Sequence, residues 1–122
     1  MSHIVEIRAQ VRDAAAVRAA CRRLGLPEPV AGSHRLFLTE VQGLGVRLSG
    51  WQYPVVCQLA TGQIRYDNYG GRWGKQKELD AFLQAYAVEK AKLEARRKGH
   101  ACTEEPLADG SIKLTIHVGG TA

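Results

Sequence analysis

The stretch that decides the fold is GQIRYDNYGGRWGKQKELDAFLQAY, residues 62–86. It opens with a short strand pattern from Gln63 to Asp67, continues through a glycine-rich turn and ends in helical periodicity. Leu79, Phe82 and Tyr86 recur at the spacing of one helix face, which predicts an amphipathic helix from about Gln76 to Lys98. The chain therefore combines sheet and helix through one glycine-rich connection.

Upstream of this stretch, short strand patterns are separated by turns that contain glycine. They cover Arg35–Val41, Gly45–Leu48 and Pro54–Leu59. Connections this short predict antiparallel hairpins, because a parallel crossover needs a dozen or more residues. The middle of the chain should therefore be an antiparallel meander.

The N-terminal part predicts one strand and one helix. Residues Ile4–Val11 alternate between apolar and polar side chains, the pattern of a strand with one buried face. Asp13 is a favourable N-cap for a helix over Ala14–Leu24, and Gly25 is a natural left-handed stop after it.

Downstream of the long helix, Ala101–Glu105 and Ser111–Val118 predict a second hairpin around an Ala-Asp-Gly turn. The whole order predicts an α+β fold, an antiparallel sheet with two helices on one face. The ferredoxin-like split βαβ arrangement, enlarged by additional hairpin strands, fits this order best.

Length and composition indicate one ordinary globular domain over residues 1–122. The formal net charge is +5, which makes the protein basic. Residues 72–98 hold eight Lys/Arg against four Asp/Glu, so the excess is local. A local positive excess favours acidic partners, nucleic acid among them.

Cysteine usage and the chain's start predict a cytoplasmic protein. Cys21, Cys57 and Cys102 are odd in number and form no CxxC pair, which favours reduced, mostly buried thiols. The opening lacks the basic and apolar regions of a secretory signal, and no apolar run reaches membrane-spanning length. We therefore expect no membrane association.

No residue set makes a convincing catalytic or metal site, so we expect a non-enzyme without cofactor or metal. Strand alternation would place Cys102 on the same face as His100, and His117 across the hairpin, but no glycine-rich elbow accompanies them. The opening Met1-Ser2-His3 would bind copper or nickel only if Met1 were retained. Asp67 could orient a neighbouring arginine, but an Asp-Asn pair before two glycines is more often a turn.

The segment around residues 65–77 is the best candidate binding surface. A glycine-rich turn before a helix can present amides to an anion, but Lys75 is followed by Gln76, which excludes a P-loop. Aromatic rings interleaved with cations resemble a stacking surface for single strands, whereas a purely structural loop is slightly favoured. The candidate partner or nucleic-acid residues are Arg65, Tyr66, Tyr69, Arg72, Trp73, Lys75 and Lys77.

Short motifs spread over nearly the whole chain also match one known family. They are the opening Met-Ser-His, Arg12-Asp13-Ala14, Leu24-Gly25, Tyr66-Asp67, Gln84-Ala85-Tyr86-Ala87, Arg97-Lys98-Gly99-His100 and Leu107-Ala108-Asp109-Gly110-Ser111-Ile112-Lys113-Leu114. The chain resembles a domain-of-unknown-function family that occurs in bacteria and, as a hypothetical reading frame, on plastid genomes. The shared motifs mark turns and helix ends and carry no chemistry. Members of the family are encoded near AAA-type ATPases, so the resemblance implies a role in binding a partner.

The sequence therefore favours a non-enzymatic module that binds a protein partner or oligomerises through a sheet edge or the aromatic loop. Aromatic residues and arginine are enriched at the centres of such interfaces. Trp51 and Tyr53 add to the aromatic content of the loop-prone part of the chain. Single-stranded RNA or DNA binding by the same loop and the long helix is the alternative, and a small enzyme with an unassigned site is a lesser one.

Overall fold

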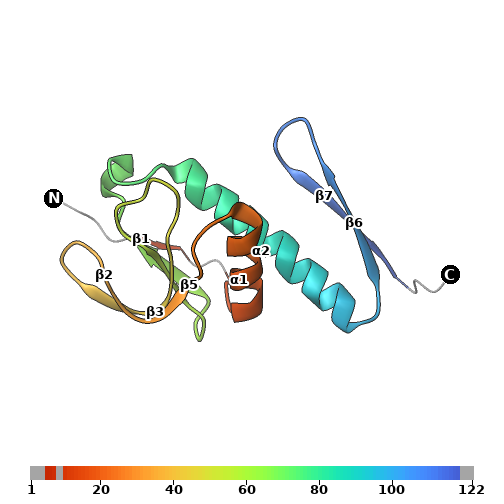
Figure 1. Cartoon of the computed structure of the whole chain (residues 1–122), viewed down its shortest axis with the longest axis horizontal. Helices are drawn as coiled ribbons and strands as arrows, with labels where there is room; N and C mark the ends of the chain where they lie inside the picture. The colour runs from red at the N-terminus through yellow and green to blue at the C-terminus, as the bar shows by residue number, and fades with distance from the viewer. Residues whose placement is uncertain (1–4, 8–9, 119–122) are drawn as a thin grey trace.

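The computed structural model of the chain describes residues 5–7 and 10–118. Five strands form one antiparallel sheet in the order β1-β5-β4-β3-β2, and β6 and β7 form a separate two-stranded sheet (Figure 1). The elements are β1 Val5–Ile7, α1 Ala14–Leu24, β2 Val30–Arg35, β3 Glu40–Val46, β4 Val55–Gln58, β5 Gln63–Tyr66, the 3₁₀ turn η1 Tyr69–Gly71, α2 Gln76–Arg97, β6 Ala101–Pro106 and β7 Ile112–His117.

Both helices cover the same face of the five-stranded sheet, which confirms the α+β class. Leu44, Cys57 and Ile64 sit in register on β3, β4 and β5, and all three belong to the main core with residues of α1 and α2. The phenol oxygen of Tyr86 on α2 accepts backbone N–H groups from Arg12 and Asp13, each at 3.1 Å. These two bonds fix the start of α1 against the middle of α2.

The opposite face of the sheet carries a second, smaller core. Leu36 and Val41 of the β2–β3 hairpin are buried there against Val56 of β4, and Tyr53 packs on them. The end of this hairpin therefore folds over the face that the helices leave uncovered. This bend brings the β2–β3 turn close to the loop that follows β5.

The predicted first helix and most strand positions are confirmed. Helix α1 has the expected bounds, and the Asp13 carboxylate accepts the Ala15 and Ala16 N–H groups at 2.9 and 3.2 Å. Of the first predicted strand, the structure describes Val5–Ile7 as β1. The prediction of a strand over Arg35–Val41 is wrong, because residues 36–39 form the turn between β2 and β3. The apolar Leu-Phe-Leu run there looked like a strand but is a hairpin tip.

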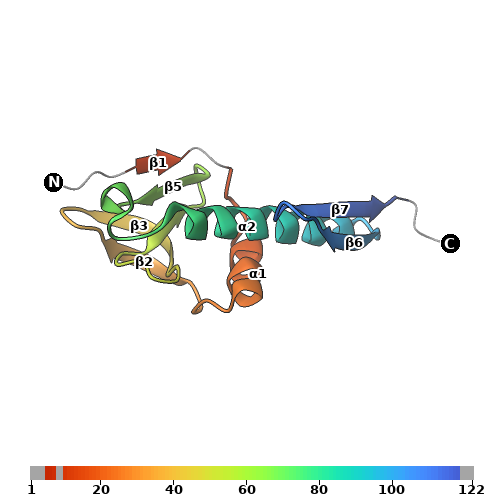
Figure 2. The same ribbon diagram turned by 90° about the horizontal axis from the view of Figure 1, so that it is seen from above.

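The ferredoxin-like split βαβ arrangement is not found. That arrangement needs a strand after the second helix to join the sheet and needs parallel neighbours. Among the described residues, β6 and β7 pair only with each other, and every pair of neighbouring strands is antiparallel. The physical reason is the length of α2, which runs past the sheet edge and carries the last hairpin beyond it (Figure 2).

An ion-pair network attaches the β6–β7 hairpin to the helices. Glu104 of β6 accepts hydrogen bonds from Arg23 of α1 and from Lys92 of α2, the latter at 2.7 Å. Arg23 also pairs with Glu89 at 2.9 Å. The hydrogen bonds from Arg23 and Lys92 hold the pKa of Glu104 at about 2. A two-stranded hairpin is marginal by itself, so these contacts supply part of its stability.

Candidate functional site

The aromatic residues around the glycine-rich loop divide into two groups. Trp51 and Tyr66 are buried in the main core, with 5.4 Å between their ring centroids in an edge-to-face arrangement. Burial raises the pKa of the Tyr66 phenol. Tyr66 therefore does not belong to a surface, and its place among the candidate partner residues is corrected. Its side chain points to the helix-covered face, as does that of Ile64 two residues earlier on β5, and both belong to the main core.

The second group is a set of four rings on the other side, which we call the surface aromatic cluster: Phe37, Tyr53, Tyr69 and Trp73. Trp73 is its centre. Its ring centroid lies 4.7 Å from that of Tyr69, stacked at 22°, and 5.1 Å from that of Phe37. Tyr53 meets Trp73 edge-on at 5.6 Å. The cluster joins three segments that are far apart in the sequence.

The turn that presents Tyr69 is built by the two residues before it. Asp67 is 1% exposed, and its Oδ1 accepts the Tyr69 N–H at 3.2 Å, which is the turn-forming role predicted for it. Asn68 is also buried, and its side-chain amide donates to the Gly74 carbonyl at 3.2 Å. Tyr69 has a φ of 49°, a left-handed conformation that costs an ordinary residue about 1–2 kcal/mol. The strained backbone directs the ring onto Trp73.

The end of the loop, Gly74 and Lys75, packs closely against the Trp51 ring. A Cβ at Gly74 would lie 2.3 Å from the indole Cδ2 of Trp51, so only glycine fits there. The Trp51 indole N–H donates to the Lys75 carbonyl at 3.1 Å, and the Trp73 carbonyl accepts the Gln52 N–H at 2.8 Å. The segment is therefore a packed connection at its ends and a partly exposed surface in its middle.

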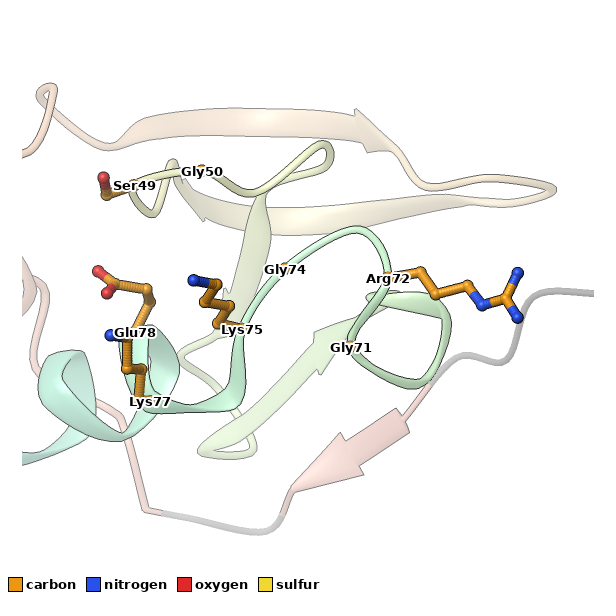
Figure 3. A pocket seen from close by; sticks show the side chains of 8 residues that line it. All are labelled: Ser49, Gly50, Gly71, Arg72, Gly74, Lys75, Lys77 and Glu78. Carbon is orange, nitrogen blue, oxygen red and sulfur yellow. The ribbon is translucent and has the colours of Figure 1, made fainter.

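Three of the four predicted cations lie at the surface. Arg72 is exposed, and its guanidinium carbon lies 5.3 Å from the centre of the Tyr69 ring. Lys75 and Lys77 are exposed at the start of α2, and Arg65 is half-buried on β5. Lys75 and Lys77 line a cavity of about 320 Å³, together with Arg72 and the half-buried Glu78. Figure 3 shows the Arg72 side chain directed away from Lys75, Lys77 and Glu78.

The cavity at the start of α2 has mixed charge. Lys75, the residue before the helix, makes no side-chain cap, and the Glu78 N–H donates to the Lys75 carbonyl at 3.1 Å. The carboxylate of Glu78 beside the two ammonium groups opposes the binding of an anion (Figure 3). The features of this region that favour binding of a ligand are therefore the surface aromatic cluster and Arg72.

Two apolar residues that sequence reasoning did not select lie at the rim of the cluster. Phe37 is 40% exposed and Leu38 is 75% exposed, at the tip of the β2–β3 hairpin. The signal was present as three consecutive apolar residues between polar flanks, Leu36 to Leu38. Such a run does not alternate as a half-buried strand does; here Leu36 is buried, and Phe37 and Leu38 are left at the surface.

The cysteines and histidines do not form a reactive group in the described part of the chain. Burial raises the pKa of the Cys57 thiol to about 12 and also raises that of Cys21, so both are protonated core residues at neutral pH. Cys102 is half-buried on β6, and His117 contacts the Thr103 hydroxyl at 2.9 Å. The Met1-Ser2-His3 motif lies outside the described residues.

Among residues 5–7 and 10–118, no three His, Cys, Asp or Glu side chains gather in a way that could hold a metal ion. Within the same ranges, neither α1 nor α2 combines the length and apolar character that crossing a membrane requires. Compared with protein-family models, with curated proteins and with solved structures, the chain matched none.

Proposed function

We propose that the protein is a non-enzymatic interaction module that binds a protein partner, or a second copy of itself, through the hairpin tip and the surface aromatic cluster. The contact between Phe37 and Trp73 carries this proposal, because it joins the exposed tip to the rings of the loop. Leu38 adds the most exposed apolar side chain of the tip. Exposed apolar groups that surround a packed aromatic centre are the composition of an interface hot spot.

Single-stranded nucleic acid is the second candidate ligand, favoured by the exposed Arg72, Lys75 and Lys77. Binding of this kind needs free ring faces on which bases can stack. Trp73 contacts three other rings, and Tyr69 has Trp73 stacked on it and Arg72 over it. Because ring surface is already occupied in this way, the geometry supports a protein partner better.

A cytoplasmic location and membership of the bacterial and plastid family of unknown function stay predictions. Support for a reducing compartment comes from Cys21 and Cys57, both of which are buried as free thiols. Burial raises the pKa of both thiols and so disfavours the nucleophilic thiolate, which is consistent with a non-enzymatic role.

The proposal is tested by affinity capture from an extract of the source cells, with light scattering of the purified protein alongside it. The wild-type protein should retain a partner or form a dimer, and Leu38→Asp should lose that association. Leu107→Asp is the matched control, since Leu107 is 41% exposed on the distant hairpin turn. A monomer that captures nothing, or an association that Leu38→Asp leaves intact, would rule this surface out.

A further inference from the structure

Ion pairs between described residues gather around the helices and β6, away from the surface aromatic cluster. Arg23 and Lys92 pair with Glu104, and Arg97 reaches Asp13 at 3.5 Å. Lys90 pairs with Glu94 in the same region, at 2.9 Å. Arg23, Lys90, Lys92 and Arg97 are therefore already paired with carboxylates of the chain itself.

The cations beside the cluster are different. Arg72, Lys75 and Lys77 are exposed, and within the described ranges none of them lies within ion-pair distance of a carboxylate. Asp67, five residues before Arg72, is buried beneath the loop, whereas the half-buried Glu78 lies beside Lys75 and Lys77 at the start of α2. Arg72, the cation next to the rings, therefore carries a positive charge that no carboxylate of the described residues pairs with.

Arg72 is the best placed of these cations. Its guanidinium lies over the Tyr69 ring, a contact that restricts the side chain before any partner arrives. A guanidinium resting on a ring face keeps N–H groups at its edge, and these match a carboxylate in a two-point contact. Figure 3 shows this side chain extended away from the start of α2.

We infer that the partner presents a short acidic peptide segment built around one apolar side chain. The apolar side chain packs against Phe37 and Leu38, and a neighbouring carboxylate pairs with Arg72. Lys75 and Lys77 contribute long-range attraction to the remaining acidic residues of the segment. This inference rests on the proposed function, because it identifies the chemistry of the partner for the same surface.

Short random peptides displayed on phage are the probe for this inference, selected on the immobilised full chain. We expect the selected peptides to be enriched in Asp and Glu on both sides of one Leu, Phe or Trp. Synthetic versions should lose about tenfold in affinity on Arg72→Glu and less on Arg72→Lys. Lys113→Glu, at an exposed position on the distant β7, should leave the affinity unchanged.

The possible results separate this inference from the proposed function. Peptides without acidic enrichment that still need Leu38 would overturn the acidic partner and leave the interaction surface standing. Peptide binding that neither Arg72→Glu nor Leu38→Asp weakens would overturn the acidic partner and the interaction surface alike. Failure to select any peptide, or displacement of the selected peptides by a random-sequence DNA oligonucleotide at equal concentration, would also overturn the inference.

Discussion

The indole of Trp73 stacks on the phenol ring of Tyr69, with 4.7 Å between the ring centroids and 22° between the ring planes. The backbone of Tyr69 in this stack has a left-handed conformation, and the Tyr69 N–H donates a hydrogen bond to the Asp67 carboxylate. Backbone strain of this kind persists only where the surrounding structure imposes it, and it is often found at functional sites. The loop that carries Tyr69 and Trp73 thus has a fixed backbone conformation and places both rings in the surface aromatic cluster.

Trp73→Ala should destabilise the protein by about 2 kcal/mol, because it removes the ring that all other members of the cluster contact. Trp73→Phe should restore more than half of this loss, since a smaller ring can still stack on Tyr69. Urea titration followed by circular dichroism measures both. A Trp73→Ala protein as stable as the wild type would show that the rings do not support one another.

Gly74→Ala should cost more stability than Gly45→Ala. The new Cβ at position 74 would meet the Trp51 indole, which is buried and hydrogen-bonded to Lys75, so we expect a loss of about 2–3 kcal/mol. The Cβ at position 45 would meet the His34 ring, which is only half-buried and contacts the Val30 carbonyl through its Nε2 at 2.7 Å. Thermal unfolding of the two variants compares them directly. Equal losses would mean that Trp51 is not fixed in place.

Glu104→Gln should weaken the attachment of the last hairpin. The folded-state pKa of Glu104 is about 2, below its ordinary value of 4.5, so its stabilising effect is complete above pH 4.5. This effect fades as the pH falls toward 2. At neutral pH we expect a loss of about 1–2 kcal/mol, allowing for solvent screening.

The neighbouring Glu105 provides the control for this effect. Glu105 is exposed and points away from Glu104 along the strand, so Glu105→Gln should change stability little. The acid branch of the stability curve, measured by urea titration between neutral pH and pH 2, should be flatter for Glu104→Gln alone. Identical curves for the two variants would contradict the network with Arg23 and Lys92.

Single-stranded oligonucleotides should bind weakly and without stacking. Loss of a stacked base usually costs about 1–3 kcal/mol, or roughly fivefold or more in affinity. Because the Trp73 ring is engaged with its neighbours, Trp73→Ala should change the affinity for a mixed-sequence oligonucleotide by less than about twofold. Fluorescence anisotropy at low salt measures this. A large loss would revive the nucleic-acid alternative.

Local signals predicted most of the elements and the antiparallel pairing of consecutive strands, but not where the last hairpin lies. The Asp13 cap and the Gly25 stop gave α1 its bounds because both act within one helical turn. The β2 strand was missed, since Pro27 and Pro29 precede it and its residues Val30–Arg35 lack alternation. The separate position of β6 and β7 depends on how far α2 extends past the sheet, which no local pattern encodes.

The candidate site was predicted in part for the same reason. Arg72 and Trp73 were singled out because aromatic and basic residues interleave in one segment. Phe37 joins them only through the fold of the β2–β3 hairpin over the sheet, a contact between segments far apart in the chain. Tyr66 was included wrongly because sequence spacing alone does not show which face of β5 meets the helices.

A photo-crosslinking amino acid at position 38 tests the central claim most directly, because Leu38 is 75% exposed at the hairpin tip. Irradiation in the source cells should give one dominant adduct, either with a partner or with a second copy of the chain. The same crosslinker at Leu107 should not give that adduct. Absence of an adduct at position 38, or the same adducts at both positions, would contradict a binding role for the hairpin tip and the surface aromatic cluster.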